Sequence, residues 1–421
     1  MPGPQRVLVV GQGYVGLPVA MRCVEVGDDV VGFDLDAAKV SGLGAGHSHV
    51  VDVSDADVAS ALETGRYRAV NDPATLESFD VAVITVPTPL ADGVPDLSHI
   101  DSAAGLIGPL VQQGCTVVLE STTYPGTTDE LLAPTLERQS GLKAGVDFHV
   151  GYSPERIDPG NTEWTFMRTP KVVAGLTPAC LAAVRGFYDR IVEQTVPVSH
   201  TRVAELTKLL ENTYRHVNVA LVNELAMHAR ALDVDIWEAI GAATTKPFGF
   251  TAFWPGPGVG GHCLPIDPSY LSWRIERQLG VHSRFVDTAN DVNQQMPDYV
   301  VRRVQLGLND RQKAVKGSRV LVLGIAYKRN TNDARETPAV GVIEALLALN
   351  ADVAVHDAQV GAHPLDHLVE RVELTQDEVA RADAVVLVTD HDGVDYPLVE
   401  RYASYVFDTR NRLRGENVEP L

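Results

Sequence analysis

Long apolar runs and basic residues are both scarce in this sequence. No stretch of about 18 apolar residues occurs, and no apolar segment of signal-peptide length precedes the first predicted strand. We therefore expect a cytoplasmic protein without a transmembrane helix. The 35 lysines and arginines are outnumbered by 55 aspartates and glutamates, which leaves a net charge of −20. This balance excludes a nucleic-acid-binding protein held by a broad basic surface, and we expect no membrane partner.

Cysteine is the next scarce residue. The chain has four, widely separated and without a CxxC pair: Cys23, Cys115, Cys180 and Cys263. This spacing predicts neither a disulfide framework nor a zinc site, so we expect reduced thiols and no bound metal.

The residues that are present describe an ordinary folded chain, 45% hydrophobic and 21% charged. At roughly 150 residues per domain, 421 residues suggest about three domains. Short apolar runs alternate with helical stretches at both ends of the chain, while residues 201–232 contain neither glycine nor proline and predict a long helix. We expect an α/β fold with two Rossmann-like doubly wound domains, joined by a long central helix and a small helical domain. The predicted domains are residues 1–200, 201–300 and 301–421, and the predicted strands are residues 6–10, 29–34, 81–86, 116–120, 171–175, 318–324, 352–357 and 384–388.

The first predicted strand runs into a glycine fingerprint, Gly11-Gln12-Gly13-Tyr14-Val15-Gly16. In this pattern the glycines permit a tight turn, a close approach to a pyrophosphate and close helix–strand packing. Asp34 ends the second predicted strand, where an acid accepts from a ribose hydroxyl and disfavours the 2′-phosphate of NADP. The sequence thus predicts an NAD site, and the alternative is a purely structural turn.

Two later strand ends carry hydroxyl groups beside prolines. Thr88 lies in Val86-Pro87-Thr88-Pro89, and Ser121 and Thr122 lie in the segment 120–127. Ligands of doubly wound sheets bind at the carboxyl ends of the strands, so we expect these residues to complete the cofactor site. Ordinary turn chemistry is the alternative.

Cys263 is the one cysteine in a glycine-rich loop, Pro255-Gly256-Pro257-Gly258-Val259-Gly260-Gly261-His262-Cys263-Leu264-Pro265-Ile266-Asp267-Pro268. Glycines let the backbone approach a ligand, and a thiolate attacks carbonyl carbon. We interpret Cys263 as a nucleophile, which implies an aldehyde or acyl intermediate. Inert packing is the alternative, and it is the expected role of the other three cysteines.

The predicted long helix and a proline-led turn supply groups that could assist the thiol. Lys208 and Asn212 are four residues apart and share a helix face, where they could stabilise an oxyanion or bind a water. Glu155, in Ser153-Pro154-Glu155-Arg156, could act as a general base. The alternatives are a surface pair of Glu205 with Lys208 and a solvated Glu155.

In the order GQGYVGLP, TPLADGVPDLS, ESTTYPGTT, YSPERIDPG, AELTKLLENTYRHVNVALVNE, GPGVGGHCLPIDP and GIAYKRNTNDARETP, these motifs span nearly the whole chain. The chain thereby resembles the UDP-glucose/GDP-mannose dehydrogenase family of nucleotide-sugar 6-dehydrogenases. The resemblance implies two NAD-linked oxidations of a sugar C6 alcohol to a carboxylate, through a thiohemiacetal and a thioester. It places the family's catalytic groups on Cys263, Lys208, Asn212, Asp267, Glu155 and Thr122, with Glu155 or Asp267 activating the hydrolytic water.

The resemblance also implies binding residues. Gly260, Lys328 and Arg410 join Glu155, Lys208 and Asn212 as substrate-binding residues, and Arg335 lies near the NAD pyrophosphate. The turn Gly324-Ile325-Ala326-Tyr327-Lys328 lacks the full fingerprint, so the last domain is expected to bind the sugar nucleotide rather than a second NAD. Because the family pairs subunits through the long helix, a homodimer is implied.

The sugar is indicated less directly. The motifs SPER and GGHCLPIDP, with Lys246-Pro247-Phe248-Gly249-Phe250 before the loop, look most like UDP-N-acetylglucosamine 6-dehydrogenase. Another UDP-N-acetylhexosamine, UDP-glucose or dTDP-glucose stays open, as does the pathway, which could be exopolysaccharide or secondary-metabolite synthesis. Two rival functions are a one-step β-hydroxyacid-type dehydrogenase, which needs no thiol, and a non-catalytic NAD-binding regulator.

Overall fold

The computed structural model describes residues 3–91, 93–158, 161, 163–261 and 264–421. The chain divides into two compact units. Unit 1 comprises Met1–Glu211 and Trp273–Gly280, and unit 2 comprises Asn212–Ser272 and Val281–Leu421. The three domain boundaries expected from the sequence stay a prediction.

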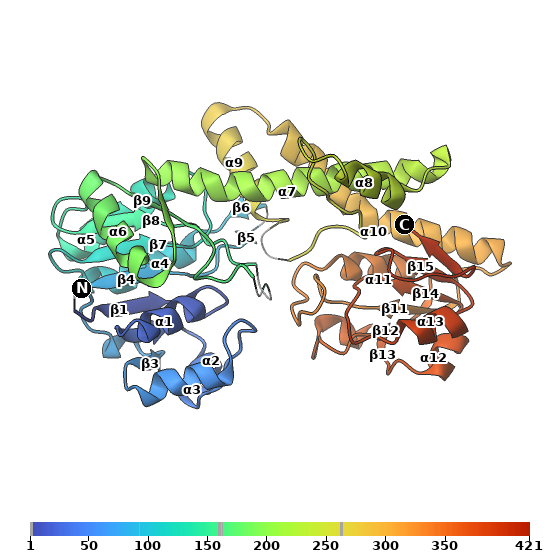
Figure 1. Cartoon of the computed structure of the whole chain (residues 1–421), viewed down its shortest axis with the longest axis horizontal. Coiled ribbons are helices and arrows are strands. Elements are labelled where there is room, and N and C mark those ends of the chain that lie inside the picture. The colour runs from blue at the N-terminus through green and yellow to red at the C-terminus, as the bar shows by residue number, and fades with distance from the viewer. Residues whose placement is uncertain (1–2, 92, 159–160, 162, 262–263) are drawn as a thin grey trace. The chain divides into compact units, whose positions relative to one another are not determined.

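Unit 1 is built on an eight-stranded sheet in the order β10-β9-β8-β7-β4-β1-β2-β3 (Figure 1). All neighbours pair in parallel except β8 and β9, which are antiparallel. The chain order reverses between β1 and β4, which makes that place the switch point of a doubly wound sheet. The strands are β1 Arg6–Val10, β2 Asp29–Phe33, β3 Tyr67–Val70, β4 Val81–Ile84, β7 Thr116–Leu119, β8 His149–Tyr152, β9 Lys171–Gly175 and β10 Thr195–Pro197, with a separate hairpin of β5 Leu90–Ala91 and β6 Val94–Pro95.

Helices cover both faces of this sheet because alternate strand residues point to opposite sides. Val7 and Val9 of β1 pack with α1 and α6, whereas Leu8 and Val10 pack with α4 and α5. Local signals set several helix starts, as where Ser54 and Asp57 form a reciprocal capping box at α3. The helices are α1 Gly16–Glu25, α2 Ala37–Gly44, α3 Asp55–Glu63, α4 Ser98–Ile107, α5 Ala133–Ser140 and α6 Pro178–Ile191.

The long helix predicted from residue 201 is α7, Thr201–Ala229, and a 3₁₀ turn continues it to Leu232. The division between the two units falls within α7, after Glu211. The large apolar side chains of this helix do not share one environment. Leu209 is buried, but four others are exposed: Leu206, Leu210, Leu221 and Leu225.

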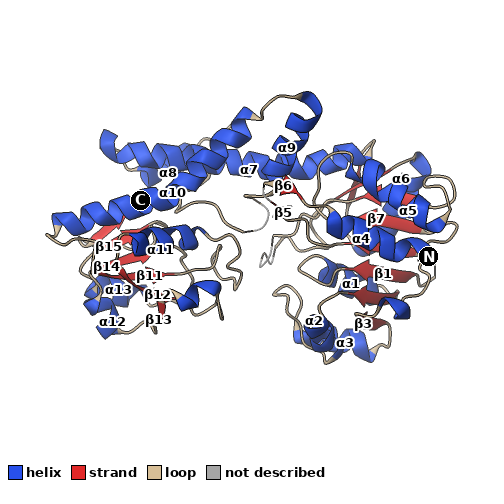
Figure 2. Cartoon of the chain, turned by 180° about the vertical axis from the view of Figure 1, so that it is seen from behind, coloured by secondary structure: helices blue, strands red, loops and turns tan. Residues whose placement is uncertain are grey.

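Unit 2 contains a six-stranded, all-parallel sheet in the order β13-β12-β11-β14-β15-β16 (Figure 2). One face packs against α10 and α11, and the other packs against α12 and α13. The two Rossmann-like folds expected from the sequence are therefore confirmed. The elements are α8 Ile236–Thr244, α9 Asp267–Leu279, α10 Arg284–Asp310, β11 Arg319–Leu323, α11 Pro338–Ala348, β12 Asp352–His356, β13 Glu370–Arg371, α12 Gln376–Arg381, β14 Ala384–Leu387, α13 Tyr396–Tyr402, β15 Val406–Asp408 and β16 Val418–Pro420.

No helix among the described residues is both long enough and apolar enough to cross a bilayer.

Candidate functional site

The glycine fingerprint of unit 1 forms the turn between β1 and α1. A Cβ on Gly16 would lie 1.9 Å from the Gly11 carbonyl oxygen, and a Cβ on Gly11 would lie 2.6 Å from that of Thr85. Gly11 also has a φ of +95°, which disfavours any residue with a side chain. These two glycines are therefore required by the turn itself.

Gly13 is different, because no described heavy atom lies within 4 Å of the position of a Cβ there. The fold alone gives no reason for glycine at this place, whereas a ligand that approaches the backbone does. At the start of α1, no described side chain caps the helix and no acid lies in its first turn. The N-terminal N–H groups and the positive end of the helix dipole thus suit a pyrophosphate, so the turn fits NAD.

Asp34 follows β2 beside this turn. Its Oδ2 accepts from the Gln12 backbone N–H at 2.9 Å, and its Oδ1 accepts from the Asp36 N–H at 2.9 Å. Each carboxylate oxygen keeps a second lone pair, so acceptance from a ribose hydroxyl is still possible. Lys39 Nζ lies 3.9 Å from Asp34 Oδ2, a cation that the sequence argument overlooked.

The two hydroxyl-bearing strand ends lie together, because β4 and β7 are parallel neighbours. Ser121 Oγ donates to the Val86 carbonyl at 2.7 Å, which joins the two segments. Thr88 and Ser121 are buried, and Thr122 is half-buried. The structure therefore groups three predicted residues at the carboxyl edge of the sheet, next to the switch point.

Glu155 is not the solvated acid of the alternative reading. It is buried, its Oε1 accepts from the Ile157 N–H, and its Oε2 lies 3.5 Å from Lys171 Nζ. Lys171 Nζ also donates to Glu120 Oε2 at 2.9 Å, and Tyr188 donates to the same carboxylate. Burial works to lower the pKa of Lys171, but attraction to the two carboxylates outweighs it and the pKa is raised. Lys171 and Glu120 were not among the predicted site residues. Each is nevertheless a charged residue at one end of an apolar strand, Lys171 at the start of β9 and Glu120 directly after β7.

Glu205 is likewise not half of a surface ion pair. It is buried, its Oε2 accepts from the Gly126 N–H at 2.6 Å, and its Oε1 accepts from the Thr128 N–H at 2.9 Å and hydroxyl at 2.7 Å. The carboxylate therefore fastens α7 to the segment that follows Ser121 and Thr122. Burial raises the pKa of Glu205, these hydrogen bonds lower it, and the result is about 7.

Lys208 and Asn212 lie one turn apart on α7, and both are buried. Asn212 Nδ2 donates to Asp267 Oδ2 at 2.5 Å, and Asp267 is the first residue of α9. Two residues predicted to be catalytic, 55 positions apart in the chain, are therefore in direct contact.

The glycine-rich loop, itself part of unit 2, packs against residues 327–338 of that unit with no space for side chains at Gly260 and Gly261. A Cβ on Gly260 would lie 2.8 Å from the Glu336 carbonyl oxygen, and one on Gly261 would lie 2.7 Å from the Tyr327 ring. The Gly261 N–H donates to the Arg335 carbonyl at 3.1 Å. His262 and Cys263 lie outside the described residues.

In unit 2, the turn after β11 is occupied by the protein's own acid. Asp357 follows β12, as Asp34 follows β2, and its Oδ2 accepts from the N–H groups of Ile325 and Ala326 at 2.7 and 3.0 Å. His391 Nε2 lies 3.2 Å from the same oxygen. These bonds occupy two backbone N–H groups of the turn, and the expectation of no second NAD site stays a prediction.

The remaining predicted cations also belong to unit 2. Arg410 donates to the Val388 carbonyl at 2.7 Å, and its guanidinium would lie 2.9 Å from a Cβ on Gly256. Arg335 forms a two-point pair with Asp333, and Lys328 is half-buried. The hydrogen bonds described for Arg335 and Arg410 are to groups of the protein itself.

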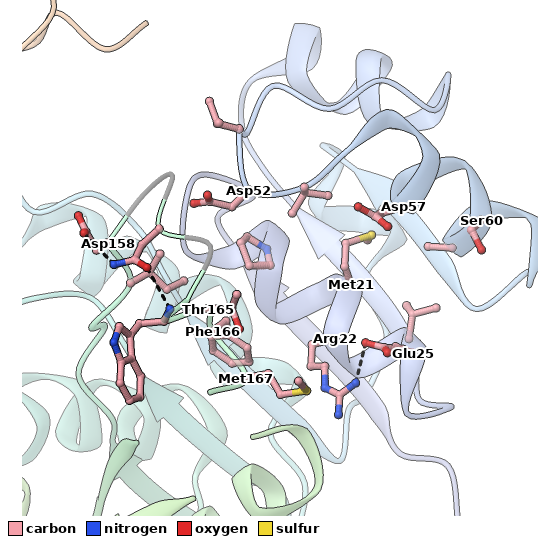
Figure 3. A pocket seen from close by; sticks show the side chains of 18 of the residues that line it. Met21, Arg22, Glu25, Asp52, Asp57, Ser60, Asp158, Thr165, Phe166 and Met167 are labelled. Carbon is pink, nitrogen blue, oxygen red and sulfur yellow. Dashed lines mark hydrogen bonds and ion pairs between the residues drawn. The ribbon is translucent and has the colours of Figure 1, made fainter. Parts of the chain in front are cut away.

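A cavity of about 800 Å³ opens on unit 1 near α1 and α3 (Figure 3). Met21, Val53 and Phe166 contribute apolar surface, and Asp52 and Asp57 contribute charge. Among the described residues, the lining of this cavity includes none of the predicted site residues.

Comparison with known proteins places these features in one family. Residues 5–192, 202–295 and 321–415 match the NAD binding, central and UDP binding domains of the UDP-glucose/GDP-mannose dehydrogenase family. The chain is 36% identical to UDP-N-acetyl-D-glucosamine 6-dehydrogenase of Pseudomonas aeruginosa, over 92% of this chain and 90% of that protein. It is 34% identical to NDP-N-acetyl-D-galactosaminuronic acid dehydrogenase of Ralstonia solanacearum, over 96% of each. The structure of UDP-D-ManNAc dehydrogenase from Pyrococcus horikoshii superposes with a TM-score of 0.90 at 30% identity, over 99% of this chain and 98% of that one.

Two fingerprint glycines give opposite predictions. Gly16→Ala should destabilise the fold strongly, because its Cβ meets the Gly11 carbonyl, whereas Gly13→Ala should leave the melting temperature unchanged. Gly13→Ala should nevertheless weaken NAD binding by about tenfold or more, since the Cβ occupies space that the pyrophosphate needs. Calorimetric melting and NAD titration check both, and unchanged NAD affinity in Gly13→Ala would contradict the assignment of this turn.

The raised pKa of Glu205 predicts a pH-dependent stability. Because the pKa of Glu205 in the folded state lies above its unfolded value, its protonation contributes stability that is fully present below pH 4.5. This contribution is lost as the pH rises through about 7. Relative to Glu205→Gln, the wild type should lose stability on the order of 3 kcal/mol between pH 4.5 and 8. Melting temperatures across that range measure the difference, with the exposed Glu224→Gln as control. Parallel curves for wild type and Glu205→Gln would refute the prediction.

Proposed function

Because the chain belongs to the UDP-glucose/GDP-mannose dehydrogenase family, we propose that it oxidises the C6 hydroxymethyl group of a UDP-N-acetylhexosamine to a carboxylate. The family membership establishes an NAD-dependent nucleotide-sugar dehydrogenase. The double oxidation, the thiol and the identity of the sugar are the parts proposed here. We further propose that residues 1–200 bind NAD, residues 201–300 carry the catalytic loop and residues 301–421 bind the sugar nucleotide.

The chemistry assigns a separate task to each group of residues. NAD, when bound, accepts one hydride in each of the two oxidations. In the first, Lys208 or a water held by Asn212 takes the proton of the C6 hydroxyl. The Cys263 thiolate then adds to the aldehyde carbon to form a thiohemiacetal, whose oxidation leaves a thioester. Water activated by Glu155 or Asp267 attacks the thioester, releases the carboxylate and restores the thiol.

The contact between Asn212 and Asp267 is the observation that carries this proposal. It joins two of the implied catalytic positions, and Asp267 lies four residues after Cys263 in the sequence. The Lys171 ammonium lies 3.5 Å from the Glu155 carboxylate and helps to hold it in place. Thr122 lies at the carboxyl end of β7 beside Ser121 and Thr88, where the cofactor is expected.

A UDP-N-acetylhexosamine is favoured by both sequence and relatives. The His262-Cys263 pair and Ile266 before Asp267 differ from the pattern associated with UDP-glucose enzymes. The relatives described above carry the names of N-acetylated glucosamine, mannosamine and galactosaminuronic acid enzymes. We propose UDP-N-acetylglucosamine first, with UDP-glucose or dTDP-glucose as the alternative.

We also propose a homodimer that pairs through α7. Large apolar side chains are exposed along this helix, and Leu210 is 62% exposed. An exposed stripe of this kind is unfavourable in water and marks an interaction surface. Its members are Val203, Leu206, Leu210, Tyr214, Leu221 and Leu225.

Stoichiometry distinguishes this function from its rivals. With UDP-N-acetylglucosamine, two NADH should form per sugar consumed, because the aldehyde is oxidised before release. A panel of UDP-N-acetylglucosamine, UDP-N-acetylmannosamine, UDP-N-acetylgalactosamine, UDP-glucose and dTDP-glucose should identify the substrate by the highest kcat/KM. One NADH per sugar would favour a one-step dehydrogenase, and none with any sugar would favour a non-catalytic regulator.

Removal of the thiol tests the mechanism separately. Cys263→Ala should abolish carboxylate formation, since no thioester can form, while NAD binding to unit 1 persists. Product analysis by mass spectrometry measures the loss. Cys180→Ala is the matched control, because Cys180 is buried within α6 and is expected to be inert. Two-step turnover near the wild-type rate in Cys263→Ala would overturn the mechanism.

A further inference from the structure

Asn223 of α7 makes a contact that no assigned role explains. Its side chain is buried, and its Oδ1 accepts from the backbone N–H of Gly256 at 2.9 Å. Gly256 lies at the start of the glycine-rich loop, seven residues before Cys263. We propose that Asn223 is a positioning residue that fixes this loop and thereby sets the place of Cys263.

Asn223 is itself held by a directed chain of hydrogen bonds between α7 and α10. Asn223 Nδ2 donates to Asn293 Oδ1 at 2.9 Å, and Asn293 Nδ2 faces His216 Nδ1 at 3.4 Å. His216 Nε2 in turn contacts Asn290 Oδ1 at 2.8 Å, so its proton belongs on Nε2. In this arrangement the donors all point one way, which leaves Asn223 Oδ1 as the acceptor for the loop.

The neutral form of His216 agrees with this arrangement. Burial lowers the pKa of His216, although the hydrogen bond to Asn290 works to raise it. A neutral imidazole with its proton on Nε2 keeps Nδ1 free to accept from Asn293. The amide of Asn293 is thus oriented, and it orients that of Asn223 in turn.

The opposite side of the loop leaves little freedom for compensation. A Cβ on Gly256 would lie 2.9 Å from the Arg410 guanidinium, and one on Gly258 would lie 3.1 Å from Pro338. The backbone is therefore enclosed by Arg410 and Pro338 on one side and anchored to Asn223 on the other. Loss of the anchor leaves a buried N–H without its acceptor, and the loop must shift to satisfy it.

Such a shift matters because catalysis by a thiol depends on placement. A displacement of about 1 Å at a reacting group can cost on the order of 100-fold in rate. The effect on turnover rests on the proposed function of Cys263, whereas the effect on the loop does not. Asn223 is a positioning residue and not a catalytic one, because it acts through the Gly256 backbone.

The test compares Asn223→Ala with Asn223→Asp and with Asn218→Ala. Asn218 is the matched control, since its side chain bonds only to the Tyr214 carbonyl of its own helix among the described contacts. Carboxylate formation should fall by about 10- to 100-fold in Asn223→Ala, while the KM for NAD stays within about twofold, because the fingerprint lies in unit 1. Asn223→Asp keeps an acceptor for Gly256 but loses the donor to Asn293, so it should recover only part of the rate.

Alkylation of Cys263 by iodoacetamide, followed peptide by peptide, provides a readout that does not need a substrate. The rate of alkylation of Cys263 should differ from that of the wild type in Asn223→Ala, because the loop has lost its anchor at Gly256. Cys23, Cys115 and Cys180 are buried and should stay unlabelled as long as unit 1 is folded. The stacked Trp237 and Trp254 rings, 5.6 Å apart, report by near-ultraviolet circular dichroism that unit 2 is folded.

Three results would overturn the proposal: wild-type alkylation and turnover in Asn223→Ala, equal losses in Asn223→Ala and Asn218→Ala, or no recovery in a folded Asn223→Asp. Failure of the proposed function has a different signature. The wild type would then form no NADH with any nucleotide sugar, while Cys263 alkylation would still differ between Asn223→Ala and Asn218→Ala.

Discussion

Burial of polar side chains along α7 is the constraint on which the rest of the structure depends. A buried polar group is costly unless it finds a partner, and several such residues on this helix find theirs in other segments. Glu205 fastens the segment after β7, Asn212 fastens Asp267, and Asn223 fastens the glycine-rich loop. The outward stripe is apolar instead. This reversal of the usual amphipathic pattern makes α7 a scaffold for loops that are far apart in the sequence.

The two Rossmann-like units solve one design problem in opposite ways. Asp34 and Asp357 occupy corresponding places after the second strand, and each accepts from backbone N–H groups of the preceding turn. In unit 1 the turn leads directly into α1, whose first N–H groups remain available. In unit 2 the acid, with His391 beside it, takes up the turn, and the next helix begins only at Pro338. The same topology therefore leaves the first helical N–H groups available in unit 1, whereas in unit 2 the acid occupies the turn.

Local patterns predicted eight of the strands, the long helix and the fingerprint turn, because each depends on residues close in sequence. They missed the short sheet strands β3, β8, β10, β13, β15 and β16. They extended several strands one or two residues too far, as at Val81–Ile84. They could not show which stripe of α7 is buried, since periodicity gives a face but not its neighbour. Lys171 was missed for a related reason: its partner Glu120 is 51 residues away, and only the folded sheet brings β7 and β9 to the same region. The proposed catalytic residues follow from the family resemblance, and the Asn212–Asp267 contact adds geometry to it.

One edge strand of each sheet, β10 and β16, has a consequence for how copies of the protein can associate. β10 and β16 are each three residues long and end in proline, Pro197 and Pro420. A proline offers no N–H to an incoming strand, and so short an edge pairs poorly. These two edges therefore resist the addition of strands from other molecules. The opposite edge strands, β3 and β13, contain no proline and are limited instead by their length of four and two residues.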